Sequence, residues 1–311
     1  MELKQLSFFK RTAELEHMSR AAEELLVSQP YLSKTISDLE GELGAPLFDH
    51  KGRNIVLNYC GKAFYAHVVN IFNELEDAKK EVQNISLSQQ STIRVATNIG
   101  QFMPSLLGIV TSGEEGISIH QRSAPRRDII HMLRNAEVDF VLCSPPLEED
   151  VEFETLPLRY ERAAIIYPEG HWLEGCAEID MSALGEETFI SVAKGYGARE
   201  YFDSAFAVCG VPAKMVIETT DTISVFEYVK RGLGISAVPL TTVLRDPCFQ
   251  KRYTLLTHNI GGEIALSWRR RQFMGAAGRR FIQCTTAYFD SLETENAELI
   301  RALAADGEND V

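Results

Sequence analysis

The chain has 311 residues, of which 45% are hydrophobic and 24% are charged. This is the composition of a globular protein, and the length favours two folding units or more. The N-terminal residues lack the apolar core of a signal peptide, and no apolar run is long enough to cross a bilayer. We therefore expect a soluble cytoplasmic protein with no membrane partner. The net charge of −13 argues, by itself, against nucleic-acid binding.

Charge near the N-terminus does not reverse this argument. Residues 1–60 contain seven Lys or Arg and nine Asp or Glu, a local net charge of −2. Any contact with nucleic acid must therefore depend on where individual cations stand and not on bulk charge.

Cysteine and histidine usage gives no sign of disulfide bonds or of a metal centre. The six cysteines stand apart, none of them in a C-x-x-C pair: Cys60, Cys143, Cys176, Cys209, Cys248 and Cys284. Without a secretion signal, reduced thiols are the expected state. We expect them to be structural and buried, with a redox switch as the alternative. No two histidines have metal-ligand spacing, so we predict no metal and no other cofactor.

Helical spacing of apolar residues predicts three helices near the N-terminus, at 3–15, 20–26 and 29–43. Ser19 is expected to cap the second helix. Pro30 fits only in the first turn of the third helix, where its missing N–H costs nothing. A single buried stripe is expected along that helix: Leu32, Ile36, Leu39 and Leu43. We expect Gly44 to end it.

The second and third of these helices are joined by a tight turn, and the third begins with small polar side chains. This pattern is typical of a helix-turn-helix. Residues 49–57 follow, with Lys-Gly-Arg between two short extended pieces. That arrangement predicts a hairpin wing.

A long helix is predicted from Asn58 to about Gln90, since the segment contains few helix breakers. Apolar residues recur along one narrow stripe of it: Tyr65, Val68, Phe72, Leu75 and Val82. Such a stripe on an otherwise charged helix is typical of a coiled-coil seam. Packing against its own domain is the alternative. We favour dimerisation, because the helix is too long to be covered by so small a domain.

After a polar linker at residues 86–91, strands and helices alternate. Residues 92–144 read as one βαβαβ unit and residues 188–239 as a second, each predicting parallel strands. Two such units predict a two-lobed α/β domain with a cleft. The chain is expected to cross between the lobes near 160–168 and to return near 255–268, with a last helix over about 275–304.

The run 19-SRAAEELLVSQPYLSKTISDLEGELGAPLF-48 resembles the N-terminal domain of LysR-type transcriptional regulators. The matching positions include Ala21-Ala22, Ser28-Gln29-Pro30, Leu39-Glu40 and Leu47-Phe48. Leu133 with Val138-Asp139, and the stretch 229-VKRGLGISAVP-239, are similar to signatures of that family's effector domain. The sequence departs from the usual pattern at Lys34, His50 and Asn58.

The resemblance implies a multidomain α and α/β architecture. It comprises a winged helix-turn-helix DNA-binding domain at 1–58, a linker and dimerisation helix at 59–90, and an effector-binding domain of periplasmic-binding-protein type at 91–311. Lobe I is expected to include about 91–161 and 267–304, and lobe II about 162–266. The implied partners are double-stranded promoter DNA, a small-molecule effector, RNA polymerase, and further copies of the chain in a homodimer or homotetramer.

Direct reading of bases requires amide or small polar side chains where a recognition helix enters the major groove. Gln29 suits a bidentate contact with adenine, and Lys51 and Arg53 at the wing suit phosphate or minor-groove contact. The full set of expected DNA contacts is Ser28, Gln29, Pro30, Tyr31, Ser33, Lys34, Lys51 and Arg53. The alternative is that Ser28-Gln29-Pro30 only caps a helix, which would leave Gln29, Tyr31 and Lys34 unexplained.

Polar residues also stand where predicted strands of the α/β part run into helices, the place where such sheets bind ligands. The candidates for effector binding are Thr97, Asn98, Gly100, Gln101, Ser123, Ser144, Ser191 and Thr222. Each could instead be an ordinary cap. Together they favour a small polar or carboxylated effector. Three arginines nearby could add positive charge or be solvated: Arg122, Arg126 and Arg127.

The alternative function class is an enzyme or a solute-binding protein, in which the two-lobed part carries an unrelated N-terminal domain. An enzyme would need a nucleophile–base pair, and a solute-binding protein a secretion signal. The sequence contains no Ser/His/Asp or Cys/His arrangement with a recognisable local motif. We therefore predict no catalytic residues and favour the regulator.

Overall fold

The structure is a computed structural model that describes residues 1–51, 54–86, 91–112, 117–147, 152–209, 214–257 and 260–309. The chain forms two compact units, residues 1–82 and 83–311. Within the described ranges, no helix combines the length and the apolarity that a membrane span requires. The expected linker residues 87–90 lie outside the described part.

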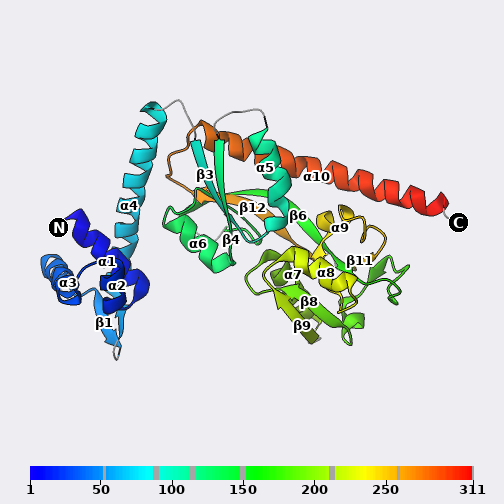
Figure 1. Cartoon of the computed structure of the whole chain (residues 1–311), viewed down its shortest axis with the longest axis horizontal. Helices are drawn as coiled ribbons and strands as arrows, with labels where there is room; N and C mark the ends of the chain where they lie inside the picture. Colours follow the sequence, from blue (N-terminus) through cyan, green and yellow to red (C-terminus); the bar gives the residue numbers. More distant parts are fainter. Residues whose placement is uncertain are drawn as a thin grey trace. The chain divides into compact units, whose positions relative to one another are not determined.

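The N-terminal unit is a helix-turn-helix followed by a two-stranded hairpin and a long helix, as expected (Figure 1). Its elements are α1 (Leu3–Leu15), α2 (Met18–Glu24), α3 (Gln29–Leu43), β1 (Phe48–Lys51), β2 (Asn54–Leu57) and α4 (Tyr59–Ser86). The three short helices enclose a common apolar core that includes Phe9, Ala22 and Leu32. Burial of that core fixes the positions of the two helices of the motif.

The ends of the short helices are set by local side-chain contacts. Ser28 caps α3, where its hydroxyl accepts a hydrogen bond from the Tyr31 N–H at 3.4 Å. Gly44 ends that helix in the left-handed region, with φ of 70°. The prediction that Ser19 caps α2 was wrong. The helix begins two residues earlier, because the extended His17 accepts the Arg20 N–H on its ring nitrogen Nδ1 at 3.3 Å.

The buried stripe of α3 is shorter than predicted. Leu32, Ile36 and Leu39 are buried, but 38% of Leu43 is exposed, because the last turn of the helix extends past the core. Leu47 takes that place in the core. The carboxylate of Glu40 holds it there by accepting the Leu47 N–H at 2.7 Å.

The hairpin pairs β1 with β2 in antiparallel register, Phe48 opposite Leu57 and Lys51 opposite Asn54. This confirms the predicted wing strands. The two residues at its tip, Gly52 and the expected DNA contact Arg53, lie outside the described part.

The apolar stripe of α4 divides into two parts. Val68 is fully buried, and Tyr65 and Phe72 pack with it against the core of the N-terminal unit. This is the packing that the alternative interpretation expected. Farther along the helix, 38% of Leu75 and 63% of Val82 remain exposed. The second half of the stripe is therefore not covered by the unit itself.

The second unit contains the expected alternation of strands and helices. Its first part comprises β3 (Ser91–Thr97), the short 3-10 helix η1 (Gly100–Phe102), α5 (Met103–Thr111), β4 (Ile117–Ser123), α6 (Arg126–Arg134) and β5 (Phe140–Cys143). Strand β3 pairs in parallel with both β4 and β5. The chain then continues into the long strand β6 (Phe153–Ile166).

The later part of the unit contains the second βαβαβ segment. Its elements are β7 (Glu178–Ile179), η2 (Met181–Leu184), β8 (Thr188–Val192), α7 (Gly197–Cys209), β9 (Lys214–Thr219), α8 (Thr222–Lys230), β10 (Ser236–Pro239), α9 (Leu240–Leu244), β11 (Tyr253–Leu256), β12 (Gly261–Arg269) and α10 (Ala276–Asn309). Strands β8 and β9 pair in parallel, as expected. Helix α10 is longer than predicted and reaches Asn309.

Strand β6 belongs to both lobes. Residues 153–162 pair with β12, and residues 163–166 pair with β10 and β11. The return strand β12 pairs with β6 from its start at Gly261 and with β5 from Ala265 to Ser267, and it is therefore grouped here with lobe I. Lobe I here means β3 to β5, the first part of β6, β12 and α10; lobe II means the last part of β6 and the elements from β7 to β11.

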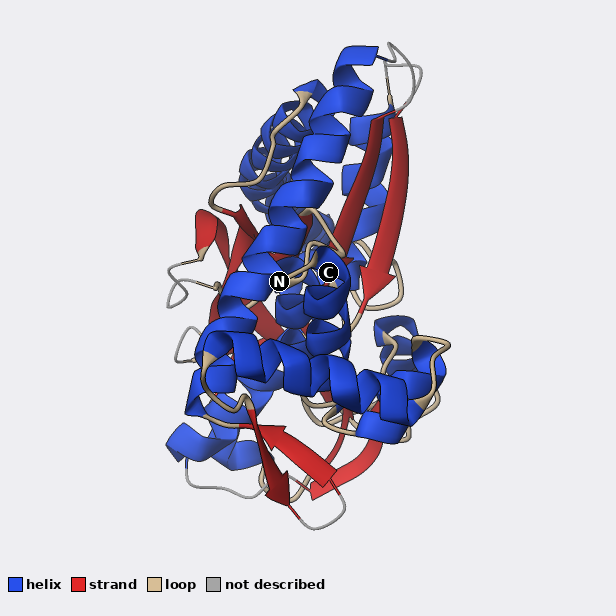
Figure 2. Ribbon diagram, turned by 90° about the vertical axis from the view of Figure 1, so that its left-hand side faces the viewer, coloured by secondary structure: helices blue, strands red, loops and turns tan. Residues whose placement is uncertain are grey.

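Helices lie on both faces of the lobe I sheet (Figures 1 and 2). Helices α5 and α10 share an apolar core with β3, β5 and β12. Helix α6 packs on the opposite face through Ile129 and Leu133. Because β3 runs parallel to β4 and β5, the carboxyl ends of the three strands lie at one edge of the sheet.

A buried carboxylate lies where β6 passes between the lobes. Glu161 is only 2% exposed. Its oxygens accept the N–H and the hydroxyl of Thr241, each at 2.8 Å, and Arg159 Nε lies 3.4 Å away. Asn296 of α10 donates to the same Thr241 hydroxyl at 2.7 Å. Burial raises the pKa of Glu161 above its ordinary value of 4.5, although Thr241 and Arg159 act in the opposite direction.

This pKa shift predicts a pH dependence of stability. Because the folded chain binds this proton more tightly than the unfolded chain, the stability that Glu161 contributes is full below about pH 4.5 and is lost as the pH rises through the raised pKa. Glu161→Gln keeps an acceptor for Thr241 and removes the titration. From pH 4.5 to 8, we expect the unfolding free energy of Glu161→Gln to fall less than that of the wild type. The difference between the two falls should be up to about 1.4 kcal/mol for each pH unit by which the folded chain raises the pKa of Glu161.

Urea unfolding followed by tryptophan fluorescence measures this difference, since Trp172 and Trp268 both lie in the second unit. Glu178→Gln, at an exposed carboxylate of the same unit, is the control for the change in charge. Wild-type and Glu161→Gln curves that ran parallel across this range would contradict the prediction.

Candidate functional site

The first candidate site is the exposed face at the start of α3. Ser28, Gln29, Pro30 and Lys34 are exposed there, and Ser33 is partly exposed. Capping accounts for Ser28, whose hydroxyl is taken by the Tyr31 N–H. In the described part of the chain, neither Gln29 nor Lys34 has a side-chain partner, so both are free to contact a ligand.

Tyr31 has a structural contact that the sequence did not indicate. Its ring meets Phe8 of α1 edge-on, with the centroids 6.1 Å apart. Its hydroxyl accepts a hydrogen bond from Lys4 at 3.5 Å. The side chain is still 47% exposed, so it both packs against α1 and borders the face.

Positive charge is distributed unevenly over this unit. On α1, Lys10 pairs with Glu14 at 2.5 Å, and Arg11 pairs with Glu14 at 2.7 Å and also with Glu24. These cations are neutralised within the unit. The cations that border the start of the helix-turn-helix and the wing are not neutralised in this way.

Among the described residues, Arg20, Lys34 and Lys51 take part in no ion pair. Arg20 and Lys51 border one hollow of about 480 Å³ between the start of α2 and the wing strands, together with His17. Sequence reasoning selected Lys34 and Lys51 and missed Arg20. The signal that could have found Arg20 is its position in the first turn of α2, the first helix of the helix-turn-helix.

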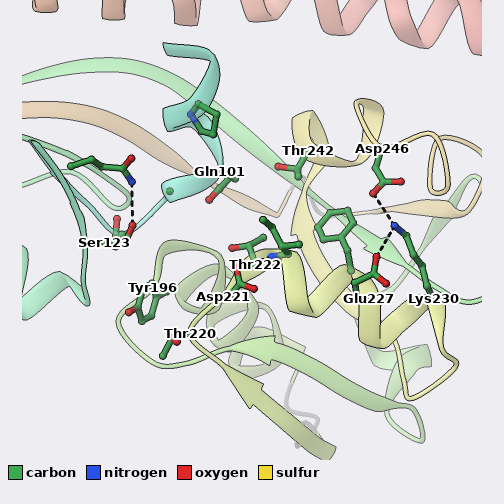
Figure 3. A pocket seen from close by; sticks show the side chains of 16 residues that line it. Gln101, Ser123, Tyr196, Thr220, Asp221, Thr222, Glu227, Lys230, Thr242 and Asp246 are labelled. Atoms are coloured by element: carbon green, nitrogen blue, oxygen red, sulfur yellow. Dashed lines mark hydrogen bonds and ion pairs between the residues drawn. The ribbon is translucent and has the colours of Figure 1, made fainter. Parts of the chain in front are cut away.

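The second candidate site is a cavity of about 420 Å³ in the second unit (Figure 3). Lobe I contributes Asn98, Gly100, Gln101, Pro104, Gln121 and Ser123. Lobe II contributes Tyr196, Thr220, Asp221, Thr222, Ile223, Phe226, Glu227, Lys230, Thr242 and Asp246. Gln101 and Thr222 face the pocket from its two sides (Figure 3). A cavity lined from both lobes at the strand ends is where this class of sheet binds ligands.

Five of the eight expected effector-binding residues line this cavity: Asn98, Gly100, Gln101, Ser123 and Thr222. The other three do not, because their side chains are buried elsewhere. The hydroxyl of Thr97 accepts the Ile99 N–H at 3.0 Å, and that of Ser144 donates to the Glu263 carbonyl. Ser191 lies inside β8 and not at its end, and is 2% exposed.

Asn98 joins the two lobes beside the pocket. Its side-chain N–H group donates to the carbonyls of Ser144, at 2.8 Å, and Gly195, at 3.2 Å. The main-chain carbonyl of Asn98 accepts the Gly197 N–H at 3.1 Å. The side-chain N–H group of Asn98 is therefore already hydrogen-bonded within the protein. The sequence predicted that Asn98 lies at the cavity, but not that it joins the lobes.

The loop that contacts Asn98 approaches lobe I too closely for side chains. Gly195 has φ of 89°, and a Cβ atom there would lie 2.9 Å from Cβ of Pro125. A Cβ on Gly197 would lie 2.5 Å from the Ile99 side chain. The Arg126 N–H also donates to the Gly195 carbonyl, at 2.9 Å. Two glycines thus allow lobe II to close against lobe I at this side of the pocket.

Sequence reasoning missed most of the lobe II wall. Helix α8 supplies much of it, and Thr222, Phe226 and Lys230 recur at the four-residue spacing of one helix face. That periodicity was visible in the sequence. What it could not tell was which face of α8 meets the cavity.

Two charged groups of this wall are held in defined states. The hydroxyl and N–H of Ser224 and the N–H of Ile223 bond to Asp221 and lower the pKa of its carboxyl. Burial alone would lower the pKa of Lys230, but the hydrogen bond to Glu227 and the charge of Asp246 raise it overall. Asp221 is therefore ionised, and Lys230 protonated, at neutral pH.

The cysteines only partly match the expectation of buried thiols. Burial raises the pKa of Cys143 to about 12, so this thiol is unreactive at neutral pH. Cys60 and Cys248 are exposed instead, at the start of α4 and in the turn after α9. The side chain of Cys209 lies outside the described part. No group of three His, Cys, Asp or Glu among the described residues is placed to hold a metal ion.

A helix-turn-helix with a wing, followed by a two-lobed α/β domain with a pocket between its lobes, defines the class of ligand-responsive DNA-binding regulators. Comparison with known families agrees. The LysR substrate binding domain matches residues 88–290, and the bacterial regulatory helix-turn-helix protein of the lysR family matches residues 3–62. The chain belongs to the LysR family of DNA-binding transcriptional regulators.

Curated relatives are regulators of the same size. The chain is 30% identical to the RuBisCO operon transcriptional regulator of Allochromatium vinosum, over 78% of this chain and 81% of that protein. It is 26% identical to the uncharacterized HTH-type transcriptional regulator YybE of Bacillus subtilis, over 93% of this chain and 99% of the other.

Solved structures show the same fold. A full-length OxyR mutant of Pseudomonas aeruginosa matches with a TM-score of 0.61 and 21% identity, covering 93% of this chain and 94% of that one. The LysR family regulator CbnR matches with a TM-score of 0.59 and 16% identity, covering 93% and 99%.

The close approach at Gly195 predicts a specific cost of adding a side chain. Gly195→Ala should lower the free energy of unfolding through both its left-handed φ and the contact with Pro125, by about 2–3 kcal/mol. Gly232→Ala is the matched control, since Gly232 has φ of 74° but open space around it. It should cost only about 1 kcal/mol, from backbone strain. Equal losses in urea unfolding of the two variants would show that the approach of the lobes at Gly195 has no energetic weight.

Proposed function

We propose that the chain is a sequence-specific promoter-binding regulator whose activity is switched by a small effector bound between the lobes of its C-terminal domain. The observation that carries this proposal is the cavity lined from both lobes, in a chain that also has the winged helix-turn-helix of the LysR family. Because the relatives are regulators, we infer that the cavity serves binding and not catalysis.

The proposed division of the chain follows the expected domains. Residues 1–58 bind DNA, residues 59–90 link and pair two chains, and residues 91–311 bind the effector. In the DNA-binding part, α3 enters the major groove of promoter DNA, where Gln29 contacts a base edge. Ser28, Ser33, Lys34 and Lys51 contact phosphates. The absence of ion pairs at Lys34 and Lys51 among the described residues supports this assignment.

Pairing of chains is part of the proposal. The exposed Leu75 and Val82 on α4 supply apolar surface for a second copy of the helix, in a homodimer or homotetramer. Two DNA-binding units held together bind two half-sites with a raised effective concentration. The same assembly would act in the cytoplasm and contact RNA polymerase at the promoter.

Switching would work through the lobes. An effector that contacts Gln101 and Ser123 on one side and Thr222 on the other favours one spacing of the lobes over another. The contacts of Asn98 with Gly195 and Gly197 are the protein's own connection between the same two lobes. Ligand binding beside this connection shifts the population of lobe arrangements, and the paired chains transmit that shift to the DNA.

The assignment of DNA contacts predicts two different defects. Gln29→Ala should weaken binding to the upstream DNA of its own gene by about 1–3 kcal/mol and leave binding to random DNA nearly unchanged. Lys51→Ala should weaken both DNAs alike and reduce the slope of log affinity against log salt by about 1 per site. Fluorescence anisotropy over a salt series measures both quantities.

Lys10→Ala serves as the control, because it removes the same charge from a lysine that is already paired with Glu14. Its salt slope should equal that of the wild type. If Gln29→Ala and Lys51→Ala affected specific and random DNA equally, the roles given to them would be wrong. If the wild type formed no specific complex at moderate salt, the proposed function itself would fail.

A further inference from the structure

We propose that the effector carries a positively charged nitrogen, as an amine or guanidinium on a short carbon chain. This inference rests on the proposed function of the cavity as the effector site. It replaces the expectation of a carboxylated effector with one of opposite charge.

The charge of the cavity wall carries the inference. Among the described residues that line it, three are carboxylates, Asp221, Glu227 and Asp246, and one is a cation, Lys230. The wall therefore has a net charge of −2 at neutral pH. An anion that enters this space meets net repulsion, whereas a cation is attracted.

The arginines that could have reversed this sign do not line the cavity. Arg122 lies 3.6 Å from Glu137. Arg126 donates to the carbonyls of Pro145 and Pro146, the latter at 2.7 Å. Arg122 and Arg126 are thus engaged outside the cavity, and Arg127 does not line it.

Lys230 shows how these carboxylates accept a cation. Its ammonium lies 3.2 Å from Glu227 Oε1 and 3.4 Å from Asp246 Oδ2 (Figure 3). One ammonium neutralises only one of the two carboxylates that it touches. Glu227, with 53% of its side chain exposed, keeps room on its open side for a second cation. Asp221, at the other end of the α8 face, adds another negative charge.

The cation is an organic one and not a metal ion. A divalent metal needs several oxygen ligands around one point. The described residues contain no cluster of three that could hold such an ion. The rest of the wall suits a carbon chain with a polar end. Phe226, Ile223 and Pro104 are apolar, and Gln101 and Ser123 on lobe I offer neutral hydrogen-bonding groups.

The test uses one five-carbon skeleton with four pairs of end groups: two ammonium groups, one ammonium and one carboxylate, two carboxylates, or two hydroxyls. The probes are 1,5-diaminopentane, 5-aminopentanoate, glutarate and 1,5-pentanediol, titrated into the full chain by calorimetry at low salt. We expect the diamine and the amino acid to bind, with the diamine at least about fivefold tighter than glutarate and the diol. Raising the salt concentration should narrow that difference, because it is electrostatic.

Variants locate the effect in the cavity. Glu227→Gln should weaken diamine binding by about two- to fivefold, the range of a partly exposed ion pair. Glu178→Gln removes the same charge from an exposed site on β7, outside the cavity wall, and should leave binding unchanged. The double variant Glu227→Gln, Asp246→Asn leaves one Asp and one Lys in the wall, so the preference for the diamine over glutarate should disappear.

Glutarate binding as tightly as the diamine, or tighter, would overturn the inference and leave the cavity as an effector site. Binding of none of the four probes at about 10 mM would overturn the inference as well. Specific promoter binding, measured on the same preparation by anisotropy, separates these outcomes from failure of the proposed function. If specific DNA binding is present, only the charge of the effector has been misassigned.

Discussion

Positive charge is scarce where this protein must meet DNA, and the rest of its N-terminal half can be understood from that constraint. The whole chain carries −13, and its first 60 residues contain more acids than bases. Of those bases, Lys10 and Arg11 are neutralised by Glu14 and Glu24. Each phosphate contact is screened by salt, so a single copy with few free cations binds weakly. Affinity must then come from joining copies, which gives the uncovered half of the α4 stripe its proposed purpose.

The proposed switch puts a different constraint on the C-terminal domain, which would have to move while it stays folded. Strand β6 pairs with β12 in lobe I and with β10 and β11 in lobe II, so one continuous strand holds both lobes. The lobes also touch directly: Asn98 and Arg126 bond to the loop at Gly195, and Asn296 of α10 donates to Thr241 of α9, so the arrangement of the lobes is a balance among such contacts. A ligand needs only a modest difference in affinity between lobe arrangements to shift such a balance.

Local chemistry made much of this structure predictable from sequence. Three predictions that depend only on neighbours in the chain are confirmed by the structure: the position of Pro30, the end of α3 at Gly44 and the order of the two βαβαβ segments. Errors arose where distant residues decide. Leu43 has the right spacing for the core but lies beyond it. Thr97 ends β3 and Ser144 follows β5, but both side chains are buried. The acidic wall escaped sequence reasoning, because Asp221 and Asp246 line one cavity only in the folded domain.

The central claim is that the DNA-binding face acts only when it is presented in pairs. Leu75→Glu with Val82→Glu adds two negative charges to the exposed stripe of α4. The control pair Ala66→Glu with Asn70→Glu adds the same charge but leaves that stripe intact, since Ala66 and Asn70 are exposed on other sides of the helix, about half a turn and about 140° away from Leu75. Mass from analytical ultracentrifugation and affinity for promoter DNA at about 150 mM salt are measured together. The claim predicts that the stripe variant becomes monomeric and loses at least about a hundredfold in affinity. A monomeric stripe variant with wild-type affinity would contradict it.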